Sequence, residues 1–183
     1  REINEEMYKK IMDNRTVEEE EAQQTAQTVG LAAIKYGDLS NQASKDYIFD
    51  VDRFTSFEGN TGPYILYTIV RIKSILNKYQ ENGGSLDGLK VRSAENSYEK
   101  ALMLQVLKFN DVFEAVYEET APHKLCAYIY ELANEFNKFY HETKILSEED
   151  EEKRAGYIAL LVLAKRVLEK CIDLLGFEAP ERM

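Results

Sequence analysis

The sequence predicts an all-α protein, a bundle of helices around a hydrophobic core. Apolar residues recur with helical spacing through nearly all of the 183 residues. Capping residues and prolines precede these stretches, where helices are expected to begin. Hydrophobic residues make up 44% of the chain, which is enough for a core of ordinary size. The length suits one domain, or one domain with a leading segment.

The first expected helix begins in a capping-box pattern at residues 16–19 (TVEE). It should run to about Tyr36, because Gly37 and Asp38 follow as helix-breaking residues. Residues 46–52 (DYIFDVD) then alternate between polar and apolar. This alternation predicts a short extended segment.

The next helix is expected from about Tyr64 to Tyr79. Thr61 offers a capping hydroxyl, and Pro63 suits the first helical turn. Residues 82–88 (NGGSLDG) are rich in glycine and predict an exposed loop after this helix.

Two further helices are expected after the glycine-rich loop. Ser93 is the predicted cap of a helix that runs to about Phe109. Asn110 or Asp111 is the predicted cap of a shorter helix that ends near Glu119.

A long helix is expected to open at Pro122, since proline is favoured in a first helical turn. Its apolar residues share one stripe, which predicts a buried face. The stripe consists of Leu125, Tyr128, Leu132, Phe136 and Phe139.

The last helix should begin after Ser147, with acidic residues in its first turn, and end at Gly176 as a C′ glycine. Residues 177–183 then form a short tail. Because apolar residues occur on several sides of this helix, it should be central in the bundle. The predicted buried face consists of Tyr157, Leu161, Ala164, Leu168, Ile172 and Leu175.

Charge and hydropathy exclude some classes of protein. There are 23 basic and 33 acidic residues, and the net charge of −10 argues against non-specific nucleic-acid binding but permits a specific site. The longest apolar run, residues 157–164, is too short to cross a membrane, and no signal peptide precedes it. We therefore expect a cytoplasmic protein, and the first residue, Arg1, suggests a fragment of a longer one.

Catalytic and metal-binding patterns are missing from the sequence. Cys126 and Cys171 are far apart and predict core thiols in a reducing compartment. His123 and His141 lack the glutamate three residues earlier that a di-iron bundle needs. No phosphate-binding glycine loop and no GxSxG elbow occurs. We therefore predict no catalytic residue and no metal site in this chain.

Several cations could attract RNA phosphates. Arg71 and Lys78 are seven residues apart and share one face of the helix that begins at Tyr64, with Lys73 to the side. Lys90 and Arg92 follow the glycine-rich loop. A solvated face and an RNA-binding groove are both compatible with this pattern. Among the aromatic residues, Tyr64, Tyr67 and Tyr140 could stack on unpaired bases or belong to the core.

Three segments carry strings that are more specific than helix composition. They are residues 30–50 (GLAAIKYGDLSNQASKDYIFD), 54–71 (FTSFEGNTGPYILYTIVR) and 157–183, which end in APERM. In this order they resemble the end of the catalytic half, the entry into the anticodon-binding domain and the last helix of arginyl-tRNA synthetases. The resemblance does not extend to residues 77–97.

The resemblance implies two parts: a helical tail of the catalytic half over residues 1–53 and a DALR-type anticodon-binding bundle over 54–183. The parent, a class I synthetase expected to be a monomer, would attach arginine to tRNA(Arg) with ATP and Mg²⁺. The His-x-Gly-His and Lys-Met-Ser-Lys-type signatures of that class are missing here, so the fragment should be inactive alone. The expected partner is the anticodon stem-loop of tRNA(Arg), not DNA or a membrane.

The resemblance also implies four tRNA-binding residues. Tyr67 matches an aromatic residue at the anticodon stem-loop, and Arg71, one helical turn later, would reach a phosphate. Tyr140 and Met183 match a pair that packs around an anticodon-loop base.

Two other functions stay open: a helical module whose acidic surface binds a protein, and an enzyme with a carboxylate-rich site in the bundle. Cysteinyl and leucyl synthetases have a related bundle, but the ending Glu-Arg-Met disfavours them.

Overall fold

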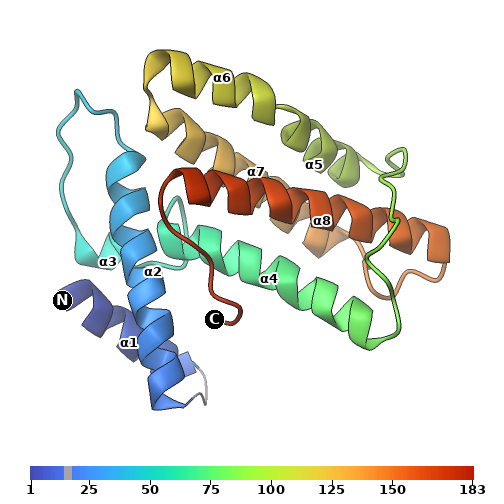
Figure 1. The fold of residues 1–183 in the computed structure, drawn as a ribbon, viewed down its shortest axis with the longest axis horizontal. Helices are drawn as coiled ribbons and strands as arrows, with labels where there is room; N and C mark the ends of the chain where they lie inside the picture. The colour runs from blue at the N-terminus through green and yellow to red at the C-terminus, as the bar shows by residue number, and fades with distance from the viewer. Residues whose placement is uncertain (15–17) are drawn as a thin grey trace.

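The computed structural model describes residues 1–14 and 18–183, and within them all regular secondary structure is α-helical (Figure 1). The all-α prediction is confirmed. The helices are α1 (Glu2–Asn14), α2 (Glu19–Leu39), α3 (Val51–Phe54), α4 (Gly62–Glu81), α5 (Ser97–Leu107), α6 (Phe109–Glu119), α7 (Pro122–Glu142) and α8 (Glu151–Leu174).

The helices α4, α7 and α8 pack against one another, and α5 and α6 cover α7. α8 contacts α4, α5 and α7, as expected for a helix inside the bundle, but α7 is more central because it contacts α2, α4, α5, α6 and α8. Figure 1 shows α2 standing across one end of this bundle, with α1 beside it. The tail, residues 177–183, leaves the end of α8 and passes over α4 beside α2.

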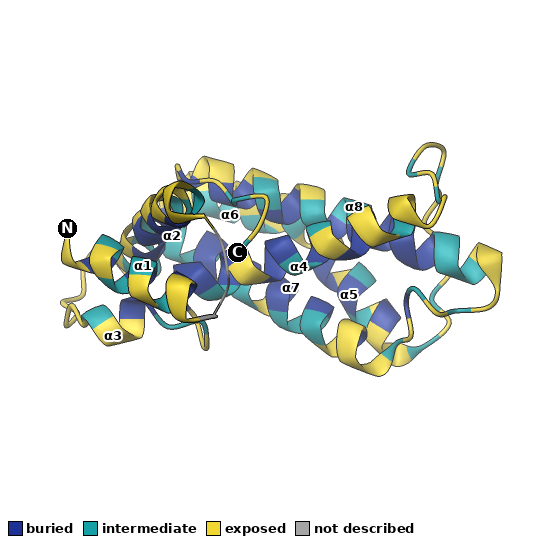
Figure 2. Ribbon diagram, turned by 90° about the horizontal axis from the view of Figure 1, so that it is seen from below, coloured by how far each residue is buried: buried dark blue, intermediate teal, exposed yellow. Residues whose placement is uncertain are grey.

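A single hydrophobic cluster runs through the molecule. It contains Met7 of α1 and Tyr36 of α2 together with the apolar faces of α4, α5, α7 and α8. The stripes predicted for α7 and α8 are buried, and Figure 2 shows the buried positions on the inner sides of the helices. Residues 1–53 therefore share their core with the rest of the chain.

Several predicted helix starts and ends are confirmed. The side-chain oxygen of Thr61 accepts a hydrogen bond from Tyr64 N at 3.2 Å, and α7 begins at Pro122. Gly176 adopts a φ of 81°, and Phe177 N donates to Ile172 O at 3.1 Å after α8 ends. These are the features of a glycine C-cap.

The expected end of α2 at Tyr36 is wrong, because the helix continues through Gly37 and Asp38 to Leu39. Gly37 serves packing rather than termination: a Cβ atom here would collide with the ring of Phe54. The helix itself begins at Glu19, and residues 16 and 17 of the capping-box pattern lie outside the described residues.

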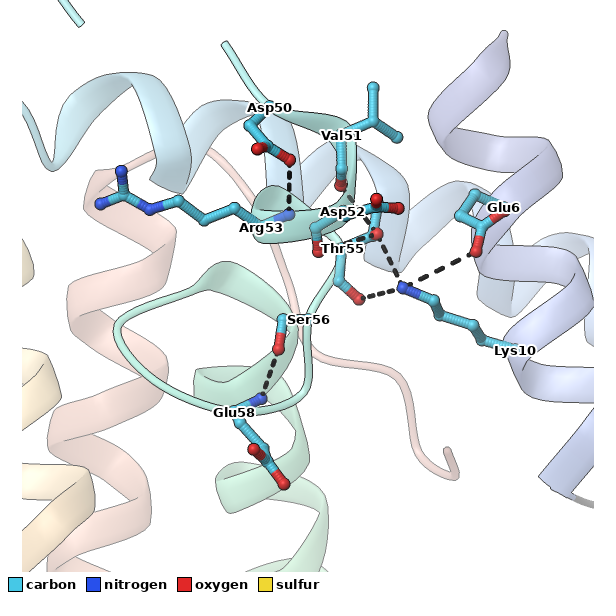
Figure 3. Close-up of polar contacts among 9 residues, drawn as sticks. All are labelled: Glu6, Lys10, Asp50, Val51, Asp52, Arg53, Thr55, Ser56 and Glu58. Carbon is cyan, nitrogen blue, oxygen red and sulfur yellow. Dashed lines mark hydrogen bonds and ion pairs between the residues drawn. The ribbon is translucent and has the colours of Figure 1, made fainter. Parts of the chain in front are cut away.

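The extended segment predicted for residues 46–52 is only partly found. Residues 46–50 have no regular structure, but Val51 already begins α3. The carboxylate of Asp50 accepts a hydrogen bond from Arg53 N at 3.0 Å and so caps this short turn (Figure 3). Figure 3 also shows Lys10 of α1, whose Nζ donates to Thr55 Oγ1 at 2.9 Å.

Two predicted caps are wrong, since each helix begins three residues later than expected. Asn96, not Ser93, caps α5, because its Oδ1 accepts from Glu99 N at 2.9 Å. Asp150, not Ser147, caps α8, because its carboxylate accepts from Glu152 N at 2.9 Å and from Lys153 N at 3.1 Å.

The predicted break between the two shorter helices also moves. α5 ends at Leu107, and α6 begins at Phe109, ahead of the caps expected at Asn110 or Asp111. Lys108 is the single residue between them and has helical backbone angles. The end of α6 at Glu119 agrees with the prediction.

Candidate functional site

Three of the four predicted tRNA-binding residues come together on one face of the bundle. Tyr67 and Arg71 lie one turn apart on α4, and Tyr140 lies near the end of α7. The guanidinium carbon of Arg71 is 4.7 Å from the ring centroid of Tyr67 and 5.1 Å from that of Tyr140. Both distances are within the range of a cation–π interaction. Two helices thus supply a cation framed by two aromatic rings.

The Arg71 guanidinium is held in place by uncharged groups. Its Nη1 donates to Asn137 Oδ1 at 2.6 Å. The amide nitrogen of Asn137 donates in turn to the hydroxyl of Tyr64 at 2.9 Å and to Thr68 Oγ1 at 3.4 Å. The Tyr64 hydroxyl donates to Asn134 Oδ1 at 2.8 Å. Because none of these partners carries a negative charge, the positive charge of Arg71 is oriented but not neutralised.

Tyr64 links two asparagines of this network through its hydroxyl group. Its side chain is half-buried, and burial raises the pKa of its hydroxyl above the ordinary value. The hydroxyl therefore stays protonated and can donate to Asn134 while it accepts from Asn137.

Tyr67 and Tyr140 are each partly exposed to solvent and partly packed against the protein. Their exposed fractions are 40% and 38%. Phe57 meets the Tyr67 ring edge to face at 6.5 Å, and Phe136 stacks on Tyr140 at 6.0 Å, both between ring centroids. A half-exposed ring that is fixed from behind is suited to stacking with an unpaired base.

Met183, the fourth predicted residue, lies at the end of the tail. It is partly buried and packs against the hydrophobic core. The backbone just before it is held by α4, since Lys73 Nζ donates to Pro180 O at 3.3 Å. The packing of Met183 and Tyr140 around a base stays a prediction.

The five cations singled out in the sequence fall into different environments. Lys73 forms ion pairs with Glu181 at 2.6 Å and Glu169 at 3.8 Å, and Arg92 pairs with Glu152 at 2.7 Å. Lys78 and Lys90 are exposed. Lys73 and Arg92 are therefore poor candidates for phosphate contacts.

Sequence reasoning missed Asn137, the residue that orients Arg71. An asparagine gives little signal by itself, because it also occurs on solvated helix faces. The available clue was its spacing: Asn134, Asn137 and Tyr140 recur every three residues on α7 and share one face.

The cysteines carry no reactive chemistry. Cys126 and Cys171 are buried and free, and burial raises the pKa of each thiol to about 12. The prediction of core thiols is confirmed. Within residues 1–14 and 18–183, no group of three or more His, Cys, Asp or Glu side chains is arranged to hold a metal ion. No helix in the same residues is long and apolar enough to cross a membrane.

Comparison with known proteins places this geometry in a family. Residues 65–183 match the DALR anticodon binding domain, and this range contains Tyr67, Arg71, Tyr140 and Met183. The chain belongs to this family. The asparagine-supported arginine and its two tyrosines thus lie inside the DALR domain.

Relatives of this DALR protein include arginine–tRNA ligases. The chain is 65% identical to the ligase of Agathobacter rectalis, with 100% of the chain and 32% of the relative covered. For the ligase of Alkaliphilus oremlandii the identity is 50%, with 99% and 31% covered. The chain therefore spans about a third of the length of these curated relatives. The resemblance to arginyl-tRNA synthetases is confirmed.

Solved structures of arginyl-tRNA synthetases have a similar fold over the matched region. Arginyl-tRNA synthetase from Thermus thermophilus matches with a TM-score of 0.84 and 32% identity, over 100% of this chain and 32% of that one. The enzyme from Plasmodium falciparum matches with a TM-score of 0.82 and 29% identity over the same shares.

Proposed function

We propose that this chain holds the anticodon stem-loop of tRNA(Arg) for an arginine–tRNA ligase of which it is a part. The observation that carries the proposal is the environment of the positive charge of Arg71. Its charge is framed by Tyr67 and Tyr140 and fixed by a neutral amide, which leaves it able to attract a phosphate. A guanidinium that is held in place between two half-exposed aromatic rings can bind the backbone of a single-stranded RNA loop while the rings stack on its bases.

Each residue then has a distinct role. Tyr67 and Tyr140 stack on unpaired bases, and Arg71 binds the backbone beside them. Met183 closes a pocket with Tyr140 around one base, since methionine is flexible and polarisable enough to fill an irregular gap. These roles rest on the positions of the residues in the DALR domain and on their exposure.

The rest of the parent protein would carry the chemistry. In this proposal residues 1–53 are the helical tail of the catalytic half, and the parent, a monomer, joins arginine to its tRNA with ATP and Mg²⁺. The chain itself should be inactive. Arginine-dependent exchange of pyrophosphate into ATP by the isolated chain, measured with tRNA present, would show that it is not.

The anticodon-binding proposal is tested by changing the anticodon and the protein together. In the full-length enzyme, a substitution in the arginine anticodon should lower kcat/KM for tRNA. In Tyr140→Ala this discrimination should shrink by roughly 10-fold to 100-fold, the range of one stacking contact. Tyr140→Phe keeps the ring and should behave like wild type. Undiminished discrimination in Tyr140→Ala would contradict the proposal.

A protein-interaction role is the second candidate, and apolar exposure on α5 and α6 favours it. Leu104 is 51% exposed, Leu107 is 73% exposed and Tyr117 is 80% exposed. Exposed apolar side chains mark a protein-binding surface where they form one contiguous patch. Salt-dependent binding that is selective for tRNA with an arginine anticodon would favour the first candidate over this one.

A further inference from the structure

The tail is anchored to α4 by a single lysine. Lys73 Nζ donates to the carbonyl oxygens of Ala179 and Pro180, at 3.5 and 3.3 Å, and to Glu181 Oε1 at 2.6 Å. It also lies 3.8 Å from Glu169 Oε1 on α8. The Lys73 side chain is only 12% exposed. Four groups from the tail and α8 thus converge on the ammonium group of one largely buried lysine side chain.

The tail is also tied to α2, on its other side. Lys35 Nζ donates to Gly176 O at the point where the tail begins. The ring of Phe177 packs edge to face on Tyr36 at 6.5 Å between centroids. Arg182 then pairs with Glu21 at 3.4 Å. These contacts guide the tail between α2 and α4, as Figure 1 shows.

We propose that Lys73 is a positioning residue that fixes the tail on α4 and thereby places Met183 for tRNA binding. The proposal rests on the anticodon-binding function proposed above. Its own evidence is the convergence of tail carbonyls and carboxylates on a lysine that solvent scarcely reaches.

The chemistry of the contact fits a fixed anchor better than a phosphate site. The carbonyls of Ala179 and Pro180 lie beyond the end of α8 and lack helical partners, and an ammonium group has three donors to satisfy such acceptors. The hydrogen bond from Lys73 also holds the pKa of Glu181 below its ordinary value. The phosphate role considered for Lys73 from the sequence would require an exposed and unpaired ammonium group.

Without the anchor, the segment near Met183 should become mobile, because chain ends are poorly ordered unless they are tied down. Met183 would then meet an RNA base only part of the time. Its contribution to tRNA binding should depend on Lys73, although the two residues are far apart in sequence. This dependence can be measured as non-additivity between substitutions.

The experiment uses the full-length enzyme and four variants: Lys73→Met, Met183→Ala, their combination, and Lys78→Met. Methionine at position 73 keeps an apolar stem and removes the donors. Lys78 is an exposed cation on the same helix, and its variant is the matched control for the mobility of the tail. Lys73→Met and Met183→Ala should each lower kcat/KM for tRNA by roughly 10-fold to 100-fold, the range expected for a single base contact. The double variant should be no worse than the more affected single variant.

A second readout follows the tail without tRNA. A nitroxide on Glu178→Cys reports local mobility. The two native cysteines of this chain are buried and should not react, and any reactive cysteine elsewhere in the full-length enzyme is first replaced by serine. Lys73→Met should raise the mobility of the label, whereas Lys78→Met should leave it unchanged. Unchanged mobility in Lys73→Met would overturn the anchor.

The outcomes also separate the two proposals. Additive losses from Lys73→Met and Met183→Ala would show that Lys73 does not act through Met183 and would overturn the inference. If Met183→Ala left kcat/KM for tRNA unchanged while Tyr140→Ala still reduced anticodon discrimination, the inference would be overturned and the anticodon-binding proposal would stay intact. If Tyr140→Ala also kept full tRNA activity, both proposals would fail.

Discussion

Arg71 and Lys73 lie two residues apart on α4, yet they face opposite kinds of environment. Arg71 contacts the neutral amide of Asn137 and the rings of two tyrosines. Lys73 contacts two carboxylates and two backbone carbonyls of the tail and α8. The partners of the first cation are uncharged, whereas the second cation pairs with carboxylates of the tail and α8.

The difference shows that the number of cations on a helix says little about RNA binding. In the proposed function, the charges of the neighbouring groups decide which cation attracts a phosphate. Residue type contributes as well, because a planar guanidinium can stack on aromatic rings, whereas a compact ammonium group suits several oxygen acceptors at once. The net charge of −10 makes this local environment more important, since the bulk field does not attract RNA.

The largest change is expected when the charge of Arg71 is removed. Arg71→Ala should weaken binding to all tRNA sequences alike, and the slope of log affinity against log salt should fall by about one unit. Lys73→Ala removes a cation of the same helix and should leave the salt slope unchanged. Filter binding over a series of salt concentrations measures both. Equal slopes for wild type and Arg71→Ala would mean that Arg71 does not contact a phosphate.

A smaller change should follow when Arg71 is given a partner like that of Lys73. Asn137→Asp keeps an acceptor for Arg71 but adds a negative charge beside the guanidinium. The pair should neutralise much of the attraction for phosphate, so the salt slope should fall by somewhat less than the roughly one unit expected for Arg71→Ala.

Asn134→Asp is the control for this substitution. It places a carboxylate on the same helix, where it can still accept from the Tyr64 hydroxyl, one turn away from Asn137. Its effect on the salt slope should be clearly weaker. An equal effect of both variants would show that the general charge of α7 matters and not the contact with Arg71.

The smallest effect is expected when the carboxylate of Glu181, the partner of Lys73, is removed. The hydrogen bond from Lys73 keeps the pKa of Glu181 below its ordinary value of 4.5, so the ionised carboxylate stabilises the folded state. This contribution is complete above the unfolded pKa and is lost as the pH falls through the lower, folded pKa. The Glu181 side chain is 81% exposed, so Glu181→Gln should lower the free energy of unfolding by less than about 0.5 kcal/mol.

Urea unfolding at neutral pH and in acid measures this difference. Wild type and Glu181→Gln should differ slightly near neutral pH and coincide below the folded pKa of Glu181. A difference that persists in acid would show that the substitution acts through something other than the ion pair with Lys73.

Local signals explain which parts of the fold were predictable. Thr61 with Pro63, and Pro122, identified the starts of α4 and α7, because a cap and a first-turn proline act within a few residues. The helix caps predicted at Ser93 and Ser147 were wrong because nearby residues can also cap a helix. The path of the chain decides which residue does so. The helix end predicted at Gly37 was wrong because this glycine packs against Phe54, which lies in another helix and is distant in sequence.

The same distinction applies to the site. Tyr67 and Arg71 are four residues apart on one helix, so their contact follows from helical spacing. Tyr140 was predicted from the resemblance and not from the pattern. Asn137 lies 66 residues from Arg71 in sequence, and Glu181 lies 108 residues from Lys73. No local pattern predicts contacts between residues so far apart.

Photo-crosslinking most directly tests whether the face of Tyr67, Arg71 and Tyr140 binds the anticodon loop. A benzophenone amino acid is placed at Tyr140 or, as a control, at Tyr117 of α6 in the full-length enzyme, and the crosslinks to tRNA(Arg) are mapped. Tyr117 is 80% exposed and Tyr140 is 38% exposed, so accessibility alone would favour position 117. We expect crosslinks from position 140 within the anticodon loop and none there from position 117. Anticodon-loop crosslinks from position 117, with none from position 140, would contradict the account.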